Sequence, residues 1–426
     1  MPPRAVLHVG APKTGTTYLQ AVLWRNRAAL ADAGVLYPLE RAGEHFHAAL
    51  DVRQMSWGGR ADGPWLGTWP RVAERVAAWD GSVVLSNELL GGATRAQAEE
   101  LAEALTAGSG RELHVVFTAR DLARQLPSDW QEHVKHRHDV GLTAFVNDLV
   151  AHGIDARAPF GELFWGLHDA ERVLDTWTGL LPPEHIHLVT VAQQRGSGRE
   201  LWDRFAAAAG LADLDLDLDV DPANVSMGVA EAEVVRRLNT HLKGRFPQRH
   251  YDALVRQVLA ERVLTSKGRL TAASERPTLP PHQWQWVEQW SRRLVDTVST
   301  AGYDVVGDLD DLLPSRAVGR QPEELSADDL LPVTFDAMAG LLRHLVHVLD
   351  NGPEVRGLRE RTAELTAELD RARTEVAYWR DGGLAHRLVR FSDQHPWVMP
   401  ARRGYLAVRE RLRQRSADAR ATDRAH

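Results

Sequence analysis

The sequence predicts an α/β fold of three layers, in which helices cover both faces of a central parallel sheet. Short, almost continuously apolar segments alternate with longer segments of helical periodicity through the first half of the chain. Strands that are apolar throughout, instead of on alternate residues, are typical of a parallel sheet buried on both faces. Helical patterns after residue 315 predict a helical C-terminal extension to this α/β domain.

Four strand–helix units support this prediction in order. The predicted strands are 5–9, 82–86, 113–118 and 185–191, and the helices after them are 16–30, 94–106, 122–136 and 199–209. Segment 229–302 is helical and predicts a cap, while 302–314 predicts a closing turn with a short strand. The alternating Leu and Asp of 211–221 favour an exposed connector over an edge strand.

The expected domains follow from these patterns. They are an α/β domain with a helical cap at 1–315, a linker with an amphipathic helix at 316–350, a helical extension at 351–415 and a disordered tail at 416–426. Within the extension, apolar residues at alternating spacings of four and three are typical of a coiled coil; the positions are Leu358, Thr362, Leu365, Leu369, Ala372, Val376 and Trp379. A homodimer through 357–380 competes with a helical hairpin as the interpretation.

Composition excludes several classes of protein. The chain has no cysteine, which excludes a disulfide framework, a thiolate metal site and a cysteine nucleophile. Its net charge of −7 argues against a general nucleic-acid binder. No segment approaches the roughly 18 apolar residues of a membrane helix, and the apolar run near Met1 is too short for a signal peptide. We therefore expect a soluble, cytoplasmic protein.

The most informative motif lies at the end of the first strand, where residues 8–20 read H-V-G-A-P-K-T-G-T-T-Y-L-Q. A strand, a glycine-containing loop and a helix start form an anion site, because backbone N–H groups and the helix dipole face the ligand. Gly10 and Gly15 allow the backbone to approach a phosphate closely. Lys13 adds a positive charge, and Thr16 and Thr17 add hydroxyl donors.

The glycine spacing matches the nucleotide-binding loop G-x-x-x-x-G-K-[ST], but Thr16 stands where that loop has its lysine. The lysine lies three residues earlier, at Lys13, which argues against ordinary ATP chemistry. The form P-K-T-G-T-T-x-L-Q resembles that of bacterial-type sulfotransferases, whose fold is similar to that of P-loop kinases. The resemblance implies that the loop, Thr14 included, binds the 5′-phosphosulfate of 3′-phosphoadenosine 5′-phosphosulfate (PAPS). It also implies that Tyr18 contacts the adenine.

A second pair of residues extends the resemblance. Sulfotransferases carry an Arg after a later strand and a Ser eight residues further on, and here Arg120 and Ser128 follow the strand 113–118 at that spacing. The resemblance implies that both bind the 3′-phosphate; alone, Arg120 could equally form a salt bridge with Asp121 or Glu132. The resemblance covers about residues 1–315, and residues 316–426 have no counterpart in the family.

Sulfuryl transfer to an alcohol needs a base and positive charge beside the leaving phosphate. Lys13 suits the charge role. Glu88 follows the strand 82–86 at the edge where parallel sheets bind ligands, so it is one candidate base; it could instead be an acid stabilised by a helix dipole. His47, with its neighbour His45, is the rival, because histidine has a suitable pKa near 6.5.

We expect no metal in this reaction, because lysine and backbone amides can neutralise the leaving group. His133, His136 and His138 resemble a metal site, but neighbouring Lys135 and Arg137 disfavour a bound cation. We therefore expect a solvated helix end there.

The expected function is transfer of a sulfuryl group from PAPS to a hydroxyl or amine of an acceptor such as a carbohydrate, glycolipid or secondary metabolite. A small-molecule kinase with a P-loop and a non-catalytic nucleotide-binding scaffold are the alternatives. Residues 384–415 carry eight arginines against Asp393 and Glu410, which favours either peripheral contact with anionic lipid or a solvated tail.

Overall fold

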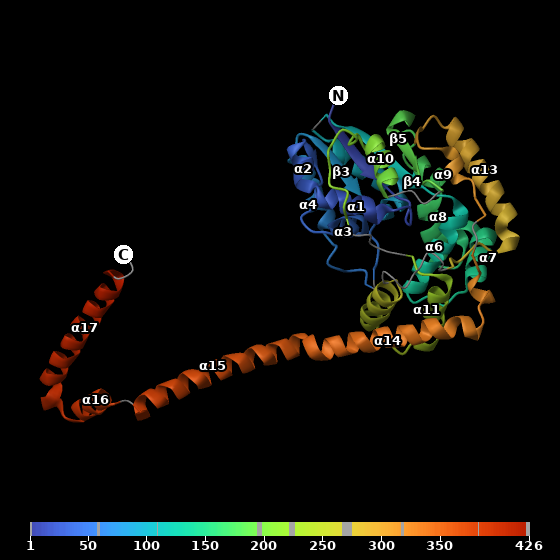
Figure 1. Cartoon of the computed structure of the whole chain (residues 1–426). Helices are drawn as coiled ribbons and strands as arrows, with labels where there is room; N and C mark the ends of the chain where they lie inside the picture. The colour runs from blue at the N-terminus through green and yellow to red at the C-terminus, as the bar shows by residue number, and fades with distance from the viewer. Residues whose placement is uncertain are drawn as a thin grey trace. The chain divides into compact units, whose positions relative to one another are not determined.

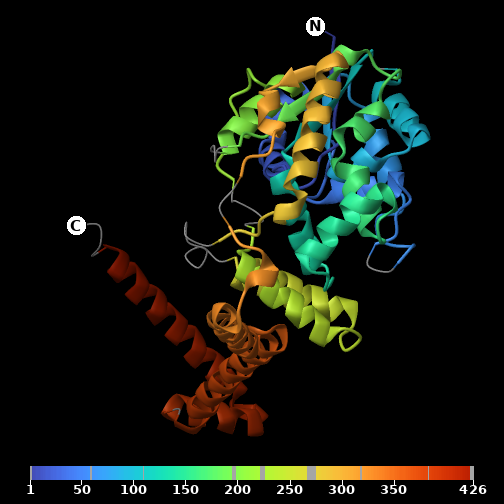
Figure 2. The same cartoon turned by 90° about the vertical axis from the view of Figure 1, so that its right-hand side faces the viewer.

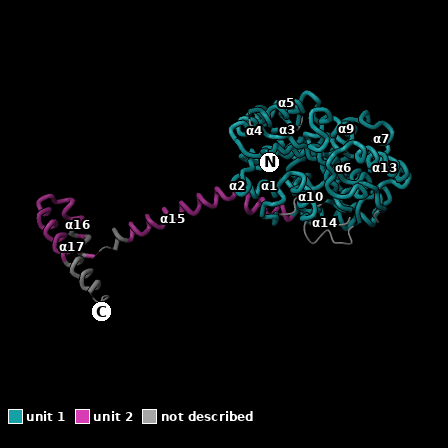
Figure 3. Tube along the Cα trace, turned by 90° about the horizontal axis from the view of Figure 1, so that it is seen from above, with its two compact units in different colours: residues 1–342 teal, residues 343–426 magenta. Residues whose placement is uncertain are grey.

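The computed structural model describes residues 2–57, 60–108, 110–193, 198–220, 226–265, 275–316, 319–381 and 383–422. The chain divides into two compact units, residues 1–342 and 343–426, which Figure 3 shows in different colours. Among the described residues, no helix combines the length and the apolar character needed to cross a membrane.

The first unit is built around six parallel strands. These are β1 (Arg4–His8), β2 (Val35–Leu36), β3 (Ser82–Ser86), β4 (Glu112–Ala119), β5 (Ile186–Thr190) and β6 (Asp304–Val306). Their order in the sheet is β2-β3-β1-β4-β5-β6, and each neighbouring pair is parallel. Because β3 and β4 flank β1, the segments that follow these three strands leave the sheet side by side at its carboxyl edge, where α/β proteins bind ligands.

Helices lie on both faces of this sheet (Figure 1 and Figure 2). Those associated with it are α1 (Thr16–Arg25), α2 (Arg27–Asp32), α3 (Glu44–Val52), α4 (Thr68–Ala77), α5 (Arg95–Thr106), α9 (Ala170–Asp175), α10 (Gly198–Ala209) and α13 (Trp284–Thr300). Apolar side chains of the strands and of these helices form one buried core. The α/β class with a parallel sheet between helices is therefore confirmed.

A second hydrophobic core lies among helices that follow β4 or precede α13. It contains the fully buried side chains of Trp130, Phe145, Phe164 and Tyr251. The helices are α6 (Leu122–Lys135), α7 (Leu142–His152), α8 (Phe160–His168), α11 (Val229–Leu242), α12 (Gln248–Tyr251) and a π-helical segment, η4 (Asp252–Val263). Short 3-10 turns occur at Glu88–Gly92 (η1), Gly153–Asp155 (η2), Pro183–His185 (η3), Pro281–Gln283 (η5), Leu309–Leu312 (η6) and Pro322–Glu324 (η7).

The strands match the predicted segments closely, and two differences have local causes. The predicted helix 16–30 divides at Asn26, whose side-chain nitrogen donates to the carbonyl oxygens of Val22 and Asp217, both at 2.8 Å. The strand β2 was not predicted, because a two-residue strand gives no readable apolar run. Residues 211–220 contain no strand, in agreement with the predicted connector.

The C-terminal part of the chain is helical. Helix α14 (Ala327–Asn351) crosses the boundary of the two units, and α15 (Pro353–Asp381), α16 (Leu384–Gln394), η8 (Pro396–Val398) and α17 (Met399–Thr422) follow it. Residues 416–422 of the predicted disordered tail belong to α17, and residues 423–426 lie outside the described part. Along α15, Leu358, Leu365, Leu369 and Val376 of the predicted stripe are exposed. The side chain of Trp379 is not among those described.

Candidate active site

The loop between β1 and α1 has the backbone of an anion site. Gly10 and Gly15 have φ angles of 118° and 98°, which glycine adopts freely because it has no side chain. Lys13 between them has a φ of 62°, a left-handed conformation that is uncommon for residues other than glycine. Gly15 is the N-cap of α1 and has no side chain to bond to the first turn. No side chain of the N-cap residue therefore bonds to the N–H groups in the first turn of α1. Helix starts of this kind bind phosphate in other proteins.

Hydrogen bonds from strand β4 hold this loop in place. The hydroxyl of Thr118 donates to the carbonyl oxygen of Gly10 at 2.8 Å and lies 2.5 Å from the hydroxyl of Thr14. The Thr14 hydroxyl also donates to the carbonyl oxygen of Ala11 at 2.6 Å. Thr14 and Thr16 are buried, whereas Thr17 is half-buried. The side chain of Thr14 thus maintains the shape of the loop.

The Lys13 side chain forms an ion pair across the site. Its Nζ lies 2.6 Å from Oε2 of Glu132 in α6. Lys135 Nζ and His136 Nε2 also approach Glu132, at 3.5 and 3.3 Å. Burial raises the pKa of Glu132, but Lys13, His136 and Lys135 outweigh it and hold that pKa well below its usual range. Glu132 is therefore an anion that holds Lys13 at the loop.

Arg120 and Ser128, predicted as a pair, are brought together. Arg120 Nη1 donates to Ser128 Oγ at 3.3 Å and to the carbonyl oxygen of Lys13 at 3.2 Å. Its Nε is buried and has no hydrogen-bond partner among the residues that the structure describes. Burial and then the neighbouring Arg124 lower the pKa of Arg120 to about 10, so it is still a cation at neutral pH. Neither predicted ion pair of Arg120 is formed: Asp121 bonds to Arg124, and Glu132 bonds to Lys13.

Two adjoining pockets connect the loop with Arg120. One of about 290 Å³ is lined by residues 13–15 together with Arg120, Arg124 and Arg276. A second of about 90 Å³ is lined by the same three arginines and Ser128. Arg124 is held in place by hydrogen bonds to the carbonyl oxygens of Val191, Ala192 and Gln193. The result is a basic chamber, defined by residues 13–15, Arg120, Arg124, Ser128 and Arg276.

Tyr18 lies beside this chamber without lining the larger pocket. Its ring packs on the start of α10, since a Cβ atom placed on Gly198 would lie 3.1 Å from the ring. Burial, followed by the charge of Asp203, raises the pKa of Tyr18. Gly198 itself does line the 290 Å³ pocket. The ring therefore borders the space next to the loop, and its contact with an adenine stays a prediction.

The candidate bases lie around the end of β3. Glu88 starts η1 and accepts a hydrogen bond from Nε2 of Gln20 at 3.0 Å. The next residue back, Asn87, contacts Nδ1 of His45 with its side-chain amide at 2.9 Å. Burial lowers the pKa of His45, opposed by the charge of Glu88. His47 is half-buried on α3, and its ring neighbours Phe46; His45 is thus the histidine that reaches the β3 end.

Glu88 and Lys13 share a third and larger pocket of about 820 Å³, which we call the acceptor pocket. Its lining includes Phe46 and Trp57, whose rings are 5.0 Å apart and perpendicular. It also contains Leu89, Leu163, Leu167, Pro12 and Pro159, with Asp129, Glu132, His133, His136, His138, Gln248, Asp252 and Arg256. His47 is not in this lining. An apolar body with polar groups at its edges would fit such a pocket.

The three histidines of 133–138 do not form a solvated helix end, so that expectation is wrong. His133 is buried, and its Nε2 lies 3.2 Å from Asp129 Oδ2, while the other oxygen of Asp129 lies 3.3 Å from His168 Nε2. Burial raises the pKa of Asp129, but His133 and His168 together lower it below its usual value. All three histidines of the motif line the acceptor pocket instead.

Several residues of the site were not predicted. Arg124 lies four residues after Arg120, in the first turn of the predicted helix 122–136, so its spacing could have indicated it. Arg276, Asp252 and Arg256 come from segments far along the chain, and no local pattern indicates that they reach the loop. The tryptophans Trp65 and Trp69 belong to the core.

Comparison of the chain with family models, with characterised proteins and with solved structures yields no match. The chemistry of the site therefore carries the functional argument.

Proposed function

We propose that the chain is a PAPS-dependent sulfotransferase whose fold belongs to the P-loop class. The observation that carries the proposal is the basic chamber, which offers two anion positions to one nucleotide. The first position is the loop with Lys13, and the second is Arg120 with Ser128. A nucleotide with phosphates on both its 5′ and 3′ carbons satisfies both, whereas ATP has no 3′-phosphate for Arg120.

The position of Glu88 supports transfer to an acceptor. Glu88 and Lys13 line the acceptor pocket together, so a hydroxyl or amine bound there can lie between a carboxylate and the end of the donor. In the proposed reaction the acceptor oxygen or nitrogen forms a bond to sulfur as the bond between sulfur and the bridging phosphate oxygen breaks. Glu88 takes the acceptor proton, and the leaving electron pair stays on the 5′-phosphate.

Lys13 and the loop amides stabilise the negative charge that grows on that leaving phosphate. Arg120 and Ser128 form the second anion position and do not contact the leaving phosphate in this proposal, so their role is to orient the donor. The apolar side chains of Phe46, Trp57 and Leu163 favour an acceptor with a ring or hydrocarbon body.

The kinase and scaffold alternatives make different predictions. A kinase would bind ATP with Mg²⁺ through the loop, and a scaffold would bind nucleotide without turnover. The lysine at position 13, instead of the position of Thr16, and the Arg120–Ser128 pair favour the sulfotransferase.

A thermal-shift comparison tests the proposal. The full chain is melted with adenosine 3′,5′-bisphosphate, and separately with ATP and Mg²⁺ at the same concentration. A ligand that binds only the folded state raises the melting temperature, by an amount that corresponds to about 2.7 kcal/mol at a hundredfold excess over Kd. We expect the bisphosphate to give the larger shift. A shift with ATP and Mg²⁺ alone would support the kinase, and transfer of labelled sulfate from PAPS to an acceptor separates enzyme from scaffold.

A further inference from the structure

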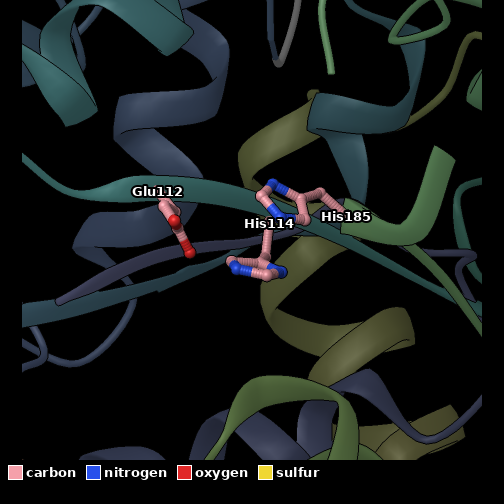
Figure 4. Close-up of side chains that lie close together, drawn as sticks. All are labelled: Glu112, His114 and His185. Carbon is pink, nitrogen blue, oxygen red and sulfur yellow. The ribbon is translucent and has the colours of Figure 1, made fainter. Parts of the chain in front are cut away.

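Three metal-ligating side chains lie together at the sheet edge opposite the candidate active site. Glu112 and His114 are the first and third residues of β4, and His185 ends the turn η3 just before β5. One oxygen or nitrogen atom from each lies within 4.8 Å of the others, and Figure 4 shows the three side chains together. Among the described residues this is the single group of His and carboxylate side chains with that geometry.

The register of the sheet brings these residues to one face. Residues 112, 114 and 116 of β4 point to the same side, because side chains alternate along a strand. His187 is paired with Val116, and Asp304 is paired with His187, so their side chains share that face. A chain of polar groups therefore runs across β4, β5 and β6 near their amino ends.

The hydrogen bonds between these polar side chains determine which ring nitrogens of His187 and His114 carry a hydrogen. Asp304 Oδ2 is 2.6 Å from His187 Nδ1, and His187 Nε2 is 2.9 Å from His114 Nδ1. A carboxylate only accepts, so the Nδ1 of His187 carries a hydrogen. The neutral ring of His187 then accepts at Nε2, which requires the hydrogen of His114 on Nδ1. The Nε2 atom of His114 is thereby left with a free lone pair.

That lone pair has no partner in the described part of the chain. His114 is only 3% exposed, and its Nε2 is buried without a hydrogen bond. A buried bare nitrogen is unfavourable unless something binds it.

The charges on this face suit a cation. Glu112 and Asp304 are carboxylates, while Arg4 is the cation in register with Glu112 on the neighbouring strand. The guanidinium of Arg4 is directed to the end of α10, where its Nη1 would lie 3.1 Å from a Cβ atom on Gly210. Of these three charged side chains in register on neighbouring strands, two are carboxylates and one is a guanidinium.

We propose that Glu112, His114 and His185 bind a divalent transition-metal ion, with Zn²⁺ the best match to two imidazoles and one carboxylate. Zinc takes this ligand set with a fourth position open to water, at about 2.0–2.2 Å from each protein atom. His187 accepts a hydrogen bond from His114 and donates one to Asp304. Such hydrogen-bonded partners commonly orient a metal-bound imidazole. The ion would join β4 to the segment before β5, at the edge of the sheet opposite the loop, so this site is separate from the proposed sulfuryl transfer.

Zinc binding by the full chain tests this site. After removal of metal with a chelator and dialysis, the protein is titrated with Zn²⁺ against a chromophoric competitor, and bound zinc is counted by mass spectrometry. We expect one zinc ion per chain. Glu112→Gln and His185→Asn should each weaken binding at least about tenfold, and both positions are accessible enough for the variants to fold. Asp304→Asn should weaken it by about 10- to 100-fold, because it disturbs the protonation of His187 and hence of His114.

His152→Asn is the matched control, because His152 also pairs with a carboxylate, Asp148, at 2.8 Å on an exposed helix end. It should leave zinc affinity unchanged. Circular dichroism confirms that each variant is folded before titration. An affinity that is unaffected by both Glu112→Gln and His185→Asn, or that falls equally in His152→Asn, would overturn the assignment.

Discussion

Replacement of Arg120 by alanine distinguishes a 3′-phosphate site from a general structural role. In the structure, Arg120 Nη1 bonds to Ser128 Oγ and to the carbonyl oxygen of Lys13, while Nε is buried and has no partner among the described residues. A 3′-phosphate in the basic chamber would give this guanidinium an anionic partner. Because the pKa of Arg120 is about 10, the residue carries its charge at the pH of an ordinary binding experiment.

The size of the effect follows from the kind of bond lost. A hydrogen bond to a charged group contributes about 1.5–3 kcal/mol, which is roughly a 10- to 150-fold change in Kd. Arg120→Ala should therefore weaken adenosine 3′,5′-bisphosphate by that factor. Adenosine 5′-phosphate lacks the 3′-phosphate, so its affinity should change much less.

Calorimetric titration of both nucleotides measures this difference directly. Ser128→Ala removes a neutral hydroxyl, worth about 0.5–1.5 kcal/mol, and should weaken the bisphosphate by only about 2- to 12-fold. Arg199→Ala is the control, because its side chain is 73% exposed and pairs loosely with Asp203; it should change neither affinity. An equal loss for both nucleotides in Arg120→Ala would refute the reasoning, since it would mean that the arginine supports the loop through Lys13.

The remaining predictions concern catalysis and assembly. Lys13→Ala should lower turnover at saturating PAPS at least about a hundredfold, because it removes one preorganised charge from the leaving phosphate; near-normal turnover would contradict this role. Glu88→Gln should preserve bisphosphate affinity while the transfer rate collapses, whereas a collapse in His47→Ala alone would assign the base to that histidine. Leu369→Asp should convert a dimer of the full chain into a monomer in light scattering, and a wild-type monomer would argue against the coiled coil. Deletion of 384–415 should abolish co-sedimentation with phosphatidylserine vesicles at low salt, and equal binding to neutral vesicles would argue against electrostatic attachment.

The elements that the sequence predicted best are those whose signal is local. The strands β1, β3, β4 and β5 are continuous apolar runs. Both ends of each strand lie within one residue of the predicted limits. Helix α5 was also predicted, and Thr94 and Gln97 form a capping box at its start. In contrast, α3 and α4 were not predicted; they lie on either side of residues 56–67, a segment rich in glycine and tryptophan.

The residues of the candidate site also fall into two groups: those that a local pattern predicts and those that only the fold brings together. The loop motif and the spacing of Arg120 and Ser128 are local, and the structure brings these residues together as expected. The acceptor pocket draws on α3, α6, α8 and η4, and nothing in those segments alone indicates that they meet. The Glu112–His114–His185 group was not predicted either, because it depends on which strands are neighbours and on their register.

The pair between Lys13 and Glu132 adds a requirement to the proposed reaction. Lys13 can stabilise a leaving phosphate only if it turns from the Glu132 carboxylate, which holds it at 2.6 Å in this structure. Breaking an ion pair is costly when one charge is left buried and uncompensated. Glu132 has further partners, because Lys135 and His136 also lie within 3.5 Å of it in this structure. The cluster therefore lets the loop lysine move to a bound anion at a modest free-energy cost, while α6 keeps its carboxylate neutralised.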